Sequence, residues 1–121
     1  MKVFLNPGHA PGGHPDSGAV NSESGLRECD VALAVGQSAE SYLNAAGVAT
    51  ELLQSNSLAE ICVAANASDA DIFVSIHCNA AEAAGPTAQK PGPAPAVTVA
   101  ACWRTASRTR LSMPWIRQIV A

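Results

Sequence analysis

The chain has 121 residues, the size of a single domain. Hydrophobic residues make up 48% of it, which suffices for a globular core, and no apolar run approaches the roughly 20 residues that a membrane helix needs. The sequence therefore excludes a membrane span. It also lacks a signal-peptide pattern, because the apolar run after Lys2 already ends at Asn6, and the route of any export stays open.

Charge divides the chain into two unlike parts. Residues 1–85 hold all ten acidic residues and two of the seven basic ones, whereas residues 86–121 hold five basic residues and no acid. Five of the eight prolines also follow residue 85. We expect no nucleic-acid partner, because the basic residues gather only in the second part and aromatic residues make up just 4% of the chain.

The four cysteines stand at positions 29, 62, 78 and 102, and no CxxC pair occurs. Neither a cysteine zinc site nor a disulfide framework is therefore expected. We interpret the cysteines as mostly buried small hydrophobic residues.

The first elements in chain order are a strand, a long loop and a helix. Residues 2–5 form a short apolar run that predicts a buried strand, and residues 6–25 are rich in Gly, Pro, Ser, Asn and Asp, as in a functional loop. Residues 28–46 fit an amphipathic helix that ends at a C-cap glycine, Gly47. Its expected apolar face carries Val31, Val35, Ala39, Tyr42, Leu43 and Ala46.

A second strand, helix and strand follow. Residues 48–53 predict a strand, and Ser57 with Glu60 forms a capping box for a helix that ends near residue 68. Residues 71–76 form a strong apolar run that ends at His77, typical of a strand buried on both faces. The alternation predicts an α/β fold with a mostly parallel sheet sandwiched by helices.

Two histidines and a glutamate are candidates for a metal site. Function in such sheets gathers at the carboxyl ends of the strands, where His9 and His77 are expected. Catalytic zinc takes three protein ligands from imidazole nitrogen and carboxylate oxygen, so adding Glu28 at the start of the helix completes a sufficient set. Strand alternation turns Cys78 away from His77.

Each of these residues also has an ordinary structural interpretation. A lone histidine after a strand is more often a hydrogen-bonded structural group, and a glutamate at a helix start is usually a surface charge favoured by the helix dipole. His14 is expected to be a solvated loop residue. Asp16 and Asn79 are candidates for orienting ligands or contacting substrate, although loop capping explains Asp16 equally well.

Three motifs together resemble a known family. The segments LNPGHAPGGHPDSGAV, GLRECDVALAV and DIFVSIHCNAA are similar to the PGHG-like turn with its D-x-GA segment, the L-[KR]-E element and the SIHxN element of zinc-dependent N-acetylmuramoyl-L-alanine amidases of the Amidase_3 type. The resemblance covers residues 1 to about 82, with one small departure at Ala10, where the family usually has glycine.

The resemblance implies a fold, a cofactor and a substrate. It implies that His9, Glu28 and His77 bind Zn²⁺ within an amidase-like α/β domain. It implies hydrolysis of the amide between N-acetylmuramic acid and L-alanine in bacterial peptidoglycan, hence a site of action at the cell wall. The zinc would polarise the scissile carbonyl and lower the pKa of its bound water toward about 7, and a second glutamate, from a late strand, would transfer the proton.

That second glutamate has no counterpart in this chain. No Asp or Glu follows Glu82, and neither Glu82 nor Glu23 is expected to replace it, so the proton-transfer residue is unassigned. Residues 85–121 also depart from the family, because they begin with a linker-like composition and Pro114 interrupts any helix. We therefore divide the chain into an amidase-like part, 1–84, and a basic, proline-rich tail, 85–121, and expect the domain to be incomplete at its C-terminal side.

A reading-frame change is our hypothesis for the tail. Read with the last base of each codon and the first two of the next, residues 87–92 permit GTETW and residues 101–121 permit LLANCIQNQIVNALDTADRG, which resemble the family. Some letters are forced: Leu from Cys102-Trp103, Ala from Met113-Pro114 and Asp from Trp115-Ile116. The alternative is a genuine basic tail that binds anionic wall polymer. Sequencing the coding DNA decides between them.

These departures affect the expected stability and activity of the chain. The remaining sheet should expose an edge and an uncovered apolar face, so we expect weak folding and little or no amidase activity. One alternative is a module that binds zinc and wall peptide without turnover. Another is a structural α/β domain whose histidines are incidental, and this alternative predicts no bound zinc.

Overall fold

The computed structural model describes residues 1–78 and, as backbone strands, residues 97–103 and 117–120. The elements in chain order are β1 (Lys2–Pro7), the 3-10 helix η1 (Pro11–Gly13), α1 (Glu28–Ala45), β2 (Ala49–Leu52), α2 (Leu58–Ala67), β3 (Ile72–Cys78), β4 (Val97–Trp103) and β5 (Arg117–Val120). The expected strands and helices of the amidase-like part are all present, with ends that differ from the predicted ones by at most two residues.

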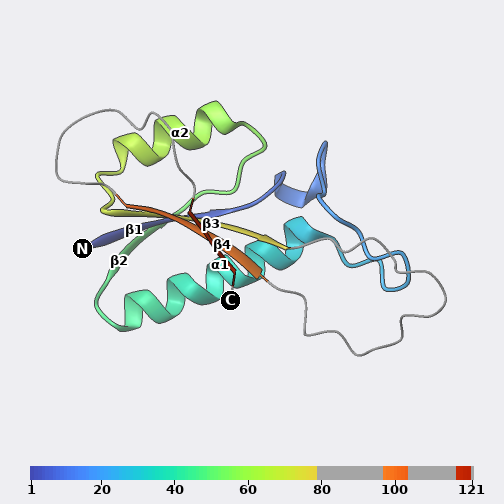
Figure 1. The fold of residues 1–121 in the computed structure, drawn as a ribbon, viewed down its shortest axis with the longest axis horizontal. Helices are drawn as coiled ribbons and strands as arrows, with labels where there is room; N and C mark the ends of the chain where they lie inside the picture. The colour runs from blue at the N-terminus through green and yellow to red at the C-terminus, as the bar shows by residue number, and fades with distance from the viewer. Residues whose placement is uncertain (79–96, 104–116, 121) are drawn as a thin grey trace.

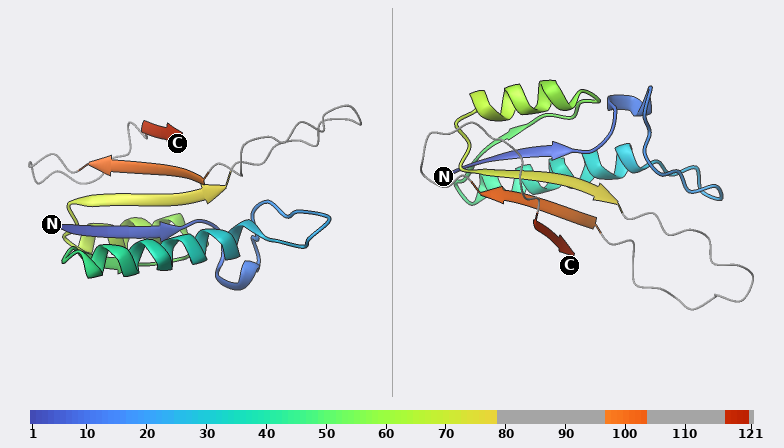
Figure 2. Two further views of the ribbon diagram at one scale, coloured as in Figure 1. Left: turned by 90° about the horizontal axis from the view of Figure 1, so that it is seen from below. Right: turned by 45° about the horizontal axis from the view of Figure 1, so that its top comes forward.

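The strands form one sheet in the order β2-β1-β3-β4-β5. β1 pairs in parallel with both β2 and β3, and α1 and α2 lie on opposite faces of this part of the sheet (Figures 1 and 2). The predicted α/β architecture is thereby confirmed. None of the helices in the described residues is both long and apolar enough to cross a bilayer.

The sheet continues beyond the parallel strands. β4 pairs antiparallel with β3 along its full length, from Ile72 opposite Trp103 to Cys78 opposite Val97, and β5 pairs antiparallel with β4. The exposed edge expected for the incomplete sheet is therefore not at β3, which β4 covers. The proline-rich composition of the tail indicated a linker and no strands. The run Val97–Trp103 is nevertheless rich in residues that favour strands.

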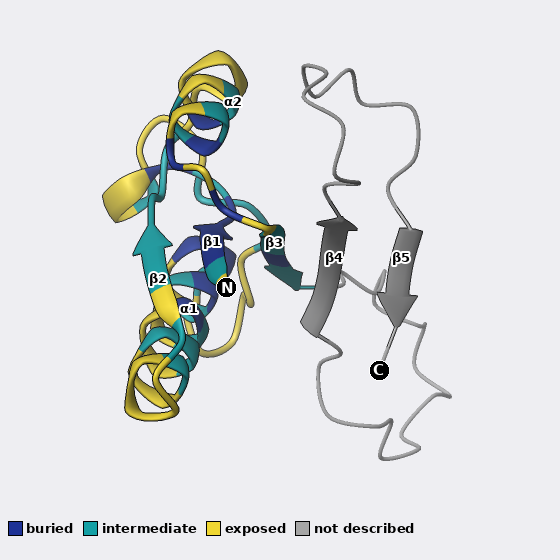
Figure 3. Ribbon diagram, turned by 90° about the vertical axis from the view of Figure 1, so that its left-hand side faces the viewer, coloured by how far each residue is buried: buried dark blue, intermediate teal, exposed yellow. Residues whose placement is uncertain are grey.

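The core lies between the central strand and the two helices. Phe4 and Leu5 of β1 are fully buried, and buried residues concentrate on β1 and the helix sides that face it (Figure 3). On the α2 side, Phe4 packs with Ala65 and Ala70, and its ring stacks on Phe73 of β3 at 5.7 Å between centroids.

Helix α1 packs on the sheet through small residues. Its buried positions are Glu28, Cys29, Ala32 and Gly36, whereas Tyr42 of the expected apolar face is 79% exposed. The predicted face is therefore wrong in part, because Tyr42 and Ala46 are exposed whereas Val31, Val35, Ala39 and Leu43 are half-buried. The reason is steric, because small side chains allow the helix axis to approach the strands closely. The hydrophobic pattern of the sequence instead predicted that the larger apolar residues would face the sheet.

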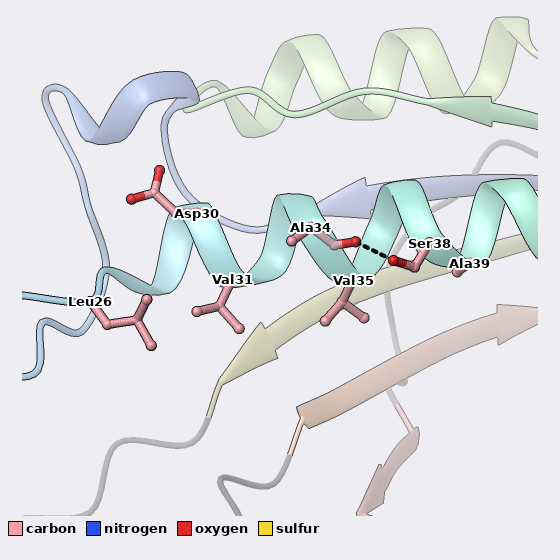
Figure 4. Close-up of a pocket in the computed structure, with 7 residues that line it drawn as sticks. All are labelled: Leu26, Asp30, Val31, Ala34, Val35, Ser38 and Ala39. Atoms are coloured by element: carbon pink, nitrogen blue, oxygen red, sulfur yellow. Dashed lines mark hydrogen bonds between the residues drawn. The ribbon is translucent and has the colours of Figure 1, made fainter. Parts of the chain in front are cut away.

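Part of the expected apolar face of α1 lines an open groove. Its lining residues are Leu26, Asp30, Val31, Ala34, Val35, Ser38 and Ala39 (Figure 4). Leu26 is 57% exposed. The uncovered apolar face was expected on the sheet, whereas this groove lies along one side of α1.

Gly36→Ala should destabilise the fold. A Cβ at Gly36 would lie 2.8 Å from Cγ of Pro7 and 3.3 Å from Cδ1 of Leu52. Alanine favours a helix over glycine by about 1 kcal/mol, but overpacking costs about 1–3 kcal/mol, so we expect a net loss in chemical denaturation. Gln37→Ala, at the exposed neighbouring position, should stay within about 0.5 kcal/mol. An unchanged or raised stability of Gly36→Ala would contradict the close packing.

The helix ends largely follow the predicted signals. Gly47 follows α1 with a φ of 78°, as a C-cap glycine does. The Ser57 hydroxyl accepts from the Glu60 backbone N–H at 3.3 Å. The second half of the capping box differs, because the Glu60 carboxylate accepts from the Ser55 hydroxyl, which in turn accepts from the Ser57 N–H.

Candidate metal centre

Three elements meet at one edge of the sheet. The carboxyl ends of β1 and β3 point the same way, and the N-terminus of α1 lies beside them (Figure 1). His9 follows β1, Glu28 is the first residue of α1, and His77 is the penultimate residue of β3. The long loop predicted after the first strand joins β1 to α1 and returns the chain to the same edge.

The three side chains converge on one point. His9 Nε2 lies 3.0 Å from Glu28 Oε1, His77 Nδ1 lies 3.2 Å from the same oxygen, and the two imidazole nitrogens are 3.3 Å apart. Among the described residues these three form the one group of His, Cys, Asp and Glu side chains close enough to share a metal ion. A cluster with this composition can hold a metal ion.

Two glycines make room for the imidazoles. A Cβ on Gly8 would lie 2.5 Å from Nδ1 of His77, and a Cβ on Gly18 would lie 2.6 Å from Nε2 of His9. His9 itself has a φ of 67°, in the left-handed region that side chains seldom adopt. Strain of this kind persists where the surrounding structure enforces it, commonly at functional sites.

The Glu28 carboxylate is held in its charged form. It is 7% exposed, and it accepts the backbone N–H of Ala19 on Oε2 at 3.0 Å and that of Cys78 on Oε1 at 2.9 Å. Burial alone would raise the pKa of Glu28, but these two N–H donors and the nearby His9 outweigh it and lower the pKa below its ordinary value. A buried anion therefore faces two imidazole nitrogens.

Asp16 contacts the outer nitrogen of His9. Its Oδ2 lies 2.9 Å from His9 Nδ1, and its Oδ1 accepts the Gly18 N–H at 2.9 Å. Burial lowers the pKa of His9, but the hydrogen bonds to Asp16 and Glu28 prevail and raise it. The two roles considered for Asp16, loop capping and ligand orientation, are thus both compatible with its contacts.

Comparison with known proteins assigns the family. The family model described as N-acetylmuramoyl-L-alanine amidase matches residues 3–89 of this chain. The chain belongs to the N-acetylmuramoyl-L-alanine amidase family. It is 39% identical over 88 residues to the N-acetylmuramoyl-L-alanine amidase LytC of Bacillus subtilis (strain 168), a match that covers 69% of this chain. The matched part corresponds to 17% of LytC, and no solved structure matches the chain.

The family match and the cluster coincide in the chain. The matched range contains His9, Glu28 and His77 and ends before β4. The open groove on α1 contains none of these three residues, so the cluster lies outside that groove.

Other candidate residues lie apart from the cluster or outside the described residues. His14 is exposed, as expected for a loop residue, and Glu23 lies in an exposed turn where its N–H donates to Asn21. Asn79 and Glu82 lie outside the described residues. Cys78 takes part through its backbone N–H and not its thiol, a role that no sequence signal could have indicated.

Asp16→Asn should weaken metal binding in this amidase-family chain. The amide keeps the size of the carboxylate but removes the charge beside His9 Nδ1. Loss of such an outer partner typically costs about 10–100-fold in metal affinity, measured here by competition with a chromophoric chelator. Asp30→Asn, whose carboxylate pairs with Arg27, is the matched control. Equal affinities for the two variants would show that Asp16 serves only to cap its loop.

Proposed function

We propose that residues 1–84 are the zinc-binding part of a peptidoglycan amidase, with His9, Glu28 and His77 as the ligands. The reaction is hydrolysis of the amide between N-acetylmuramic acid and L-alanine. The observation that carries the proposal is the convergence of three donor atoms from β1, α1 and β3 within 3.0–3.3 Å of one another. The family membership and the LytC likeness support the substrate class.

The donor set suits zinc. A tetrahedral ion with bonds of about 2.0–2.1 Å separates its ligand atoms by roughly 3.3 Å, close to the three separations in the cluster. Two imidazoles and one carboxylate match catalytic zinc sites that keep a fourth position open. The low pKa of Glu28 keeps its oxygen available to a cation.

The residues of the chain would bind the metal ion and orient the side chains that hold it. Bound zinc supplies a Lewis acid that polarises a carbonyl and acidifies a water. Asp16 fixes the ring of His9 through Nδ1 and leaves Nε2 directed at the cluster. The N–H groups of Ala19 and Cys78 hold the Glu28 carboxylate in place.

A module that binds zinc and wall peptide without turnover is the second candidate. It is favoured by one observation, the absence of any Asp or Glu after Glu82, because proton transfer to the leaving amine needs a positioned acid. For this chain we expect this second behaviour, with peptidoglycan as partner and the cell wall as the site of action. We propose residues 85–121 as a basic, proline-rich tail that arose through the frame change described above, and the family match itself extends to residue 89.

Zinc content and hydrolysis together test these proposals. Purified chain should contain one zinc per molecule by mass spectrometry under native conditions and release little or no peptide from muramyl-peptide fragments. A chain whose frame is restored after residue 84 should hydrolyse them. Zinc-loaded chain that cleaves at the rate of an intact relative would overturn the binding-only candidate, and chain without zinc would overturn both.

A further inference from the structure

Gln54 connects the two segments that carry His9 and Glu28. It stands two residues after β2, and its side-chain amide donates to two backbone carbonyls, that of Gly8 at 3.0 Å and that of Cys29 at 3.0 Å. Gly8 immediately precedes His9, and Cys29 immediately follows Glu28. One amide nitrogen therefore joins the residue next to one proposed ligand with the residue next to another.

The segment that carries Gln54 is itself anchored to the sheet. The Leu53 N–H donates to the Leu5 carbonyl at 3.0 Å, and the Leu53 carbonyl accepts from the buried Asn6 amide at 2.9 Å. The Asn6 side chain also accepts from the Ser75 hydroxyl of β3 at 3.2 Å. The residue before Gln54 is thus hydrogen-bonded to β1, the strand that leads to His9, and through Asn6 this network reaches Ser75 of β3, the strand that carries His77.

These contacts have a consequence for the metal centre. The loop between His9 and Glu28 is tied to the start of α1 by its own backbone hydrogen bonds, such as Cys29 N–H to the Ser17 carbonyl at 3.1 Å, and the Gln54 amide adds a contact from outside the loop. Metal and catalytic sites need ligand positions held to within about 0.5 Å by supporting hydrogen bonds. A side chain that donates to the carbonyls of both Gly8 and Cys29 supplies such a constraint from outside the loop.

We propose that Gln54 is a positioning residue of the metal centre, which sets the distance between His9 and Glu28 through the carbonyls of Gly8 and Cys29. The inference rests on the proposed zinc site. Gln54 does not touch the cluster, so its effect passes through the backbone. Removing the donor should leave all three ligands in the chain but misplaced relative to one another.

Gln54→Met tests this role, because methionine keeps the length of the side chain and removes the N–H donors. Gln37→Met, the same change at an exposed position of α1, is the matched control. Zinc affinity by chelator competition should fall about 10–100-fold in the Gln54 variant, and the visible bands of the cobalt-substituted chain should lose intensity. Gln37→Met should match the parent in both measurements.

The outcomes separate the two proposals. If the parent binds zinc and Gln54→Met binds it equally well with an unchanged cobalt spectrum, the positioning role is wrong and the zinc site stands. If the parent binds no zinc, both proposals fall. Should Gln54→Met fold poorly by circular dichroism, Gln54→Glu, which keeps the shape but exchanges the donors for acceptors, is measured in its place with the same expected losses.

Discussion

The His77→Ala chain is expected to bind zinc more than about 100-fold more weakly than the parent, because losing a direct ligand should exceed the 10–100-fold cost of losing an outer partner. The imidazole Nδ1 of His77 lies within 3.3 Å of both other donor atoms, and no other side chain in the described residues reaches the cluster to replace it. Chelator competition measures the loss.

His14→Ala is the control for this prediction. His14 lies in the same loop as His9 but is exposed and outside the cluster, so its removal should leave zinc affinity unchanged. Equal losses in the two variants would mean that zinc is held loosely by whichever histidines are available. Thermal unfolding with and without zinc adds a second readout, because a ligand that binds the folded state raises its stability, and His77→Ala should lose that increase.

Gly8→Ala is expected to weaken zinc binding nearly as much without removing any ligand. The added Cβ would lie 2.5 Å from Nδ1 and 2.7 Å from Nε2 of His77. The ring must therefore leave its present position beside His9 and Glu28. The backbone of Gly8 does not have a positive φ, so the expected effect is a steric one on the ring and not a strain in the chain.

Gly12→Ala separates these two causes. Gly12 lies in the same loop with a φ of 67°, and a Cβ there would meet nothing within 4 Å. This control should cost stability of about 1–2 kcal/mol through the left-handed conformation and leave zinc affinity of the folded chain close to that of the parent. A Gly8→Ala chain with parental zinc affinity would show that His77 is not confined as described.

The arrangement of strands and helices could be predicted because its signals are local. The apolar runs at residues 2–5 and 71–76 became β1 and β3, and Ser57 and Gly47 stand at the helix ends where capping rules put them. The order of elements then restricts the fold to an α/β sheet. These predictions needed no knowledge of contacts distant in sequence.

The packing of α1 could not be predicted in the same way. Periodicity favoured the stripe with Val31, Val35 and Tyr42, whereas the sheet receives Ala32 and Gly36. Which face of a helix turns inward depends on how closely the facing strand approaches, here Pro7 against Gly36. That distance is a tertiary property. The strands β4 and β5 were not predicted, because the overall composition of residues 85–121 resembles a linker and conceals the short strand-favouring run at 97–103.

In the candidate site, too, some residues could be predicted from the sequence and others could not. Residue type and family motif pointed to His9, Glu28 and His77, which the fold brings together. The supporting contacts could not be predicted from the sequence. Gln54 and the N–H groups of Ala19 and Cys78 act through backbone groups, and no sequence motif indicates such contacts. That His9, Glu28 and His77 bind zinc is a prediction.

X-ray absorption at the zinc edge of the metal-loaded chain tests the proposed coordination most directly. We predict nitrogen and oxygen neighbours at about 2.0–2.1 Å with the outer-shell scattering of two imidazoles, and loss of one imidazole in His77→Ala. A sulfur neighbour at about 2.3 Å, as from Cys78, or a shell of oxygen alone would contradict the two-histidine, one-glutamate site.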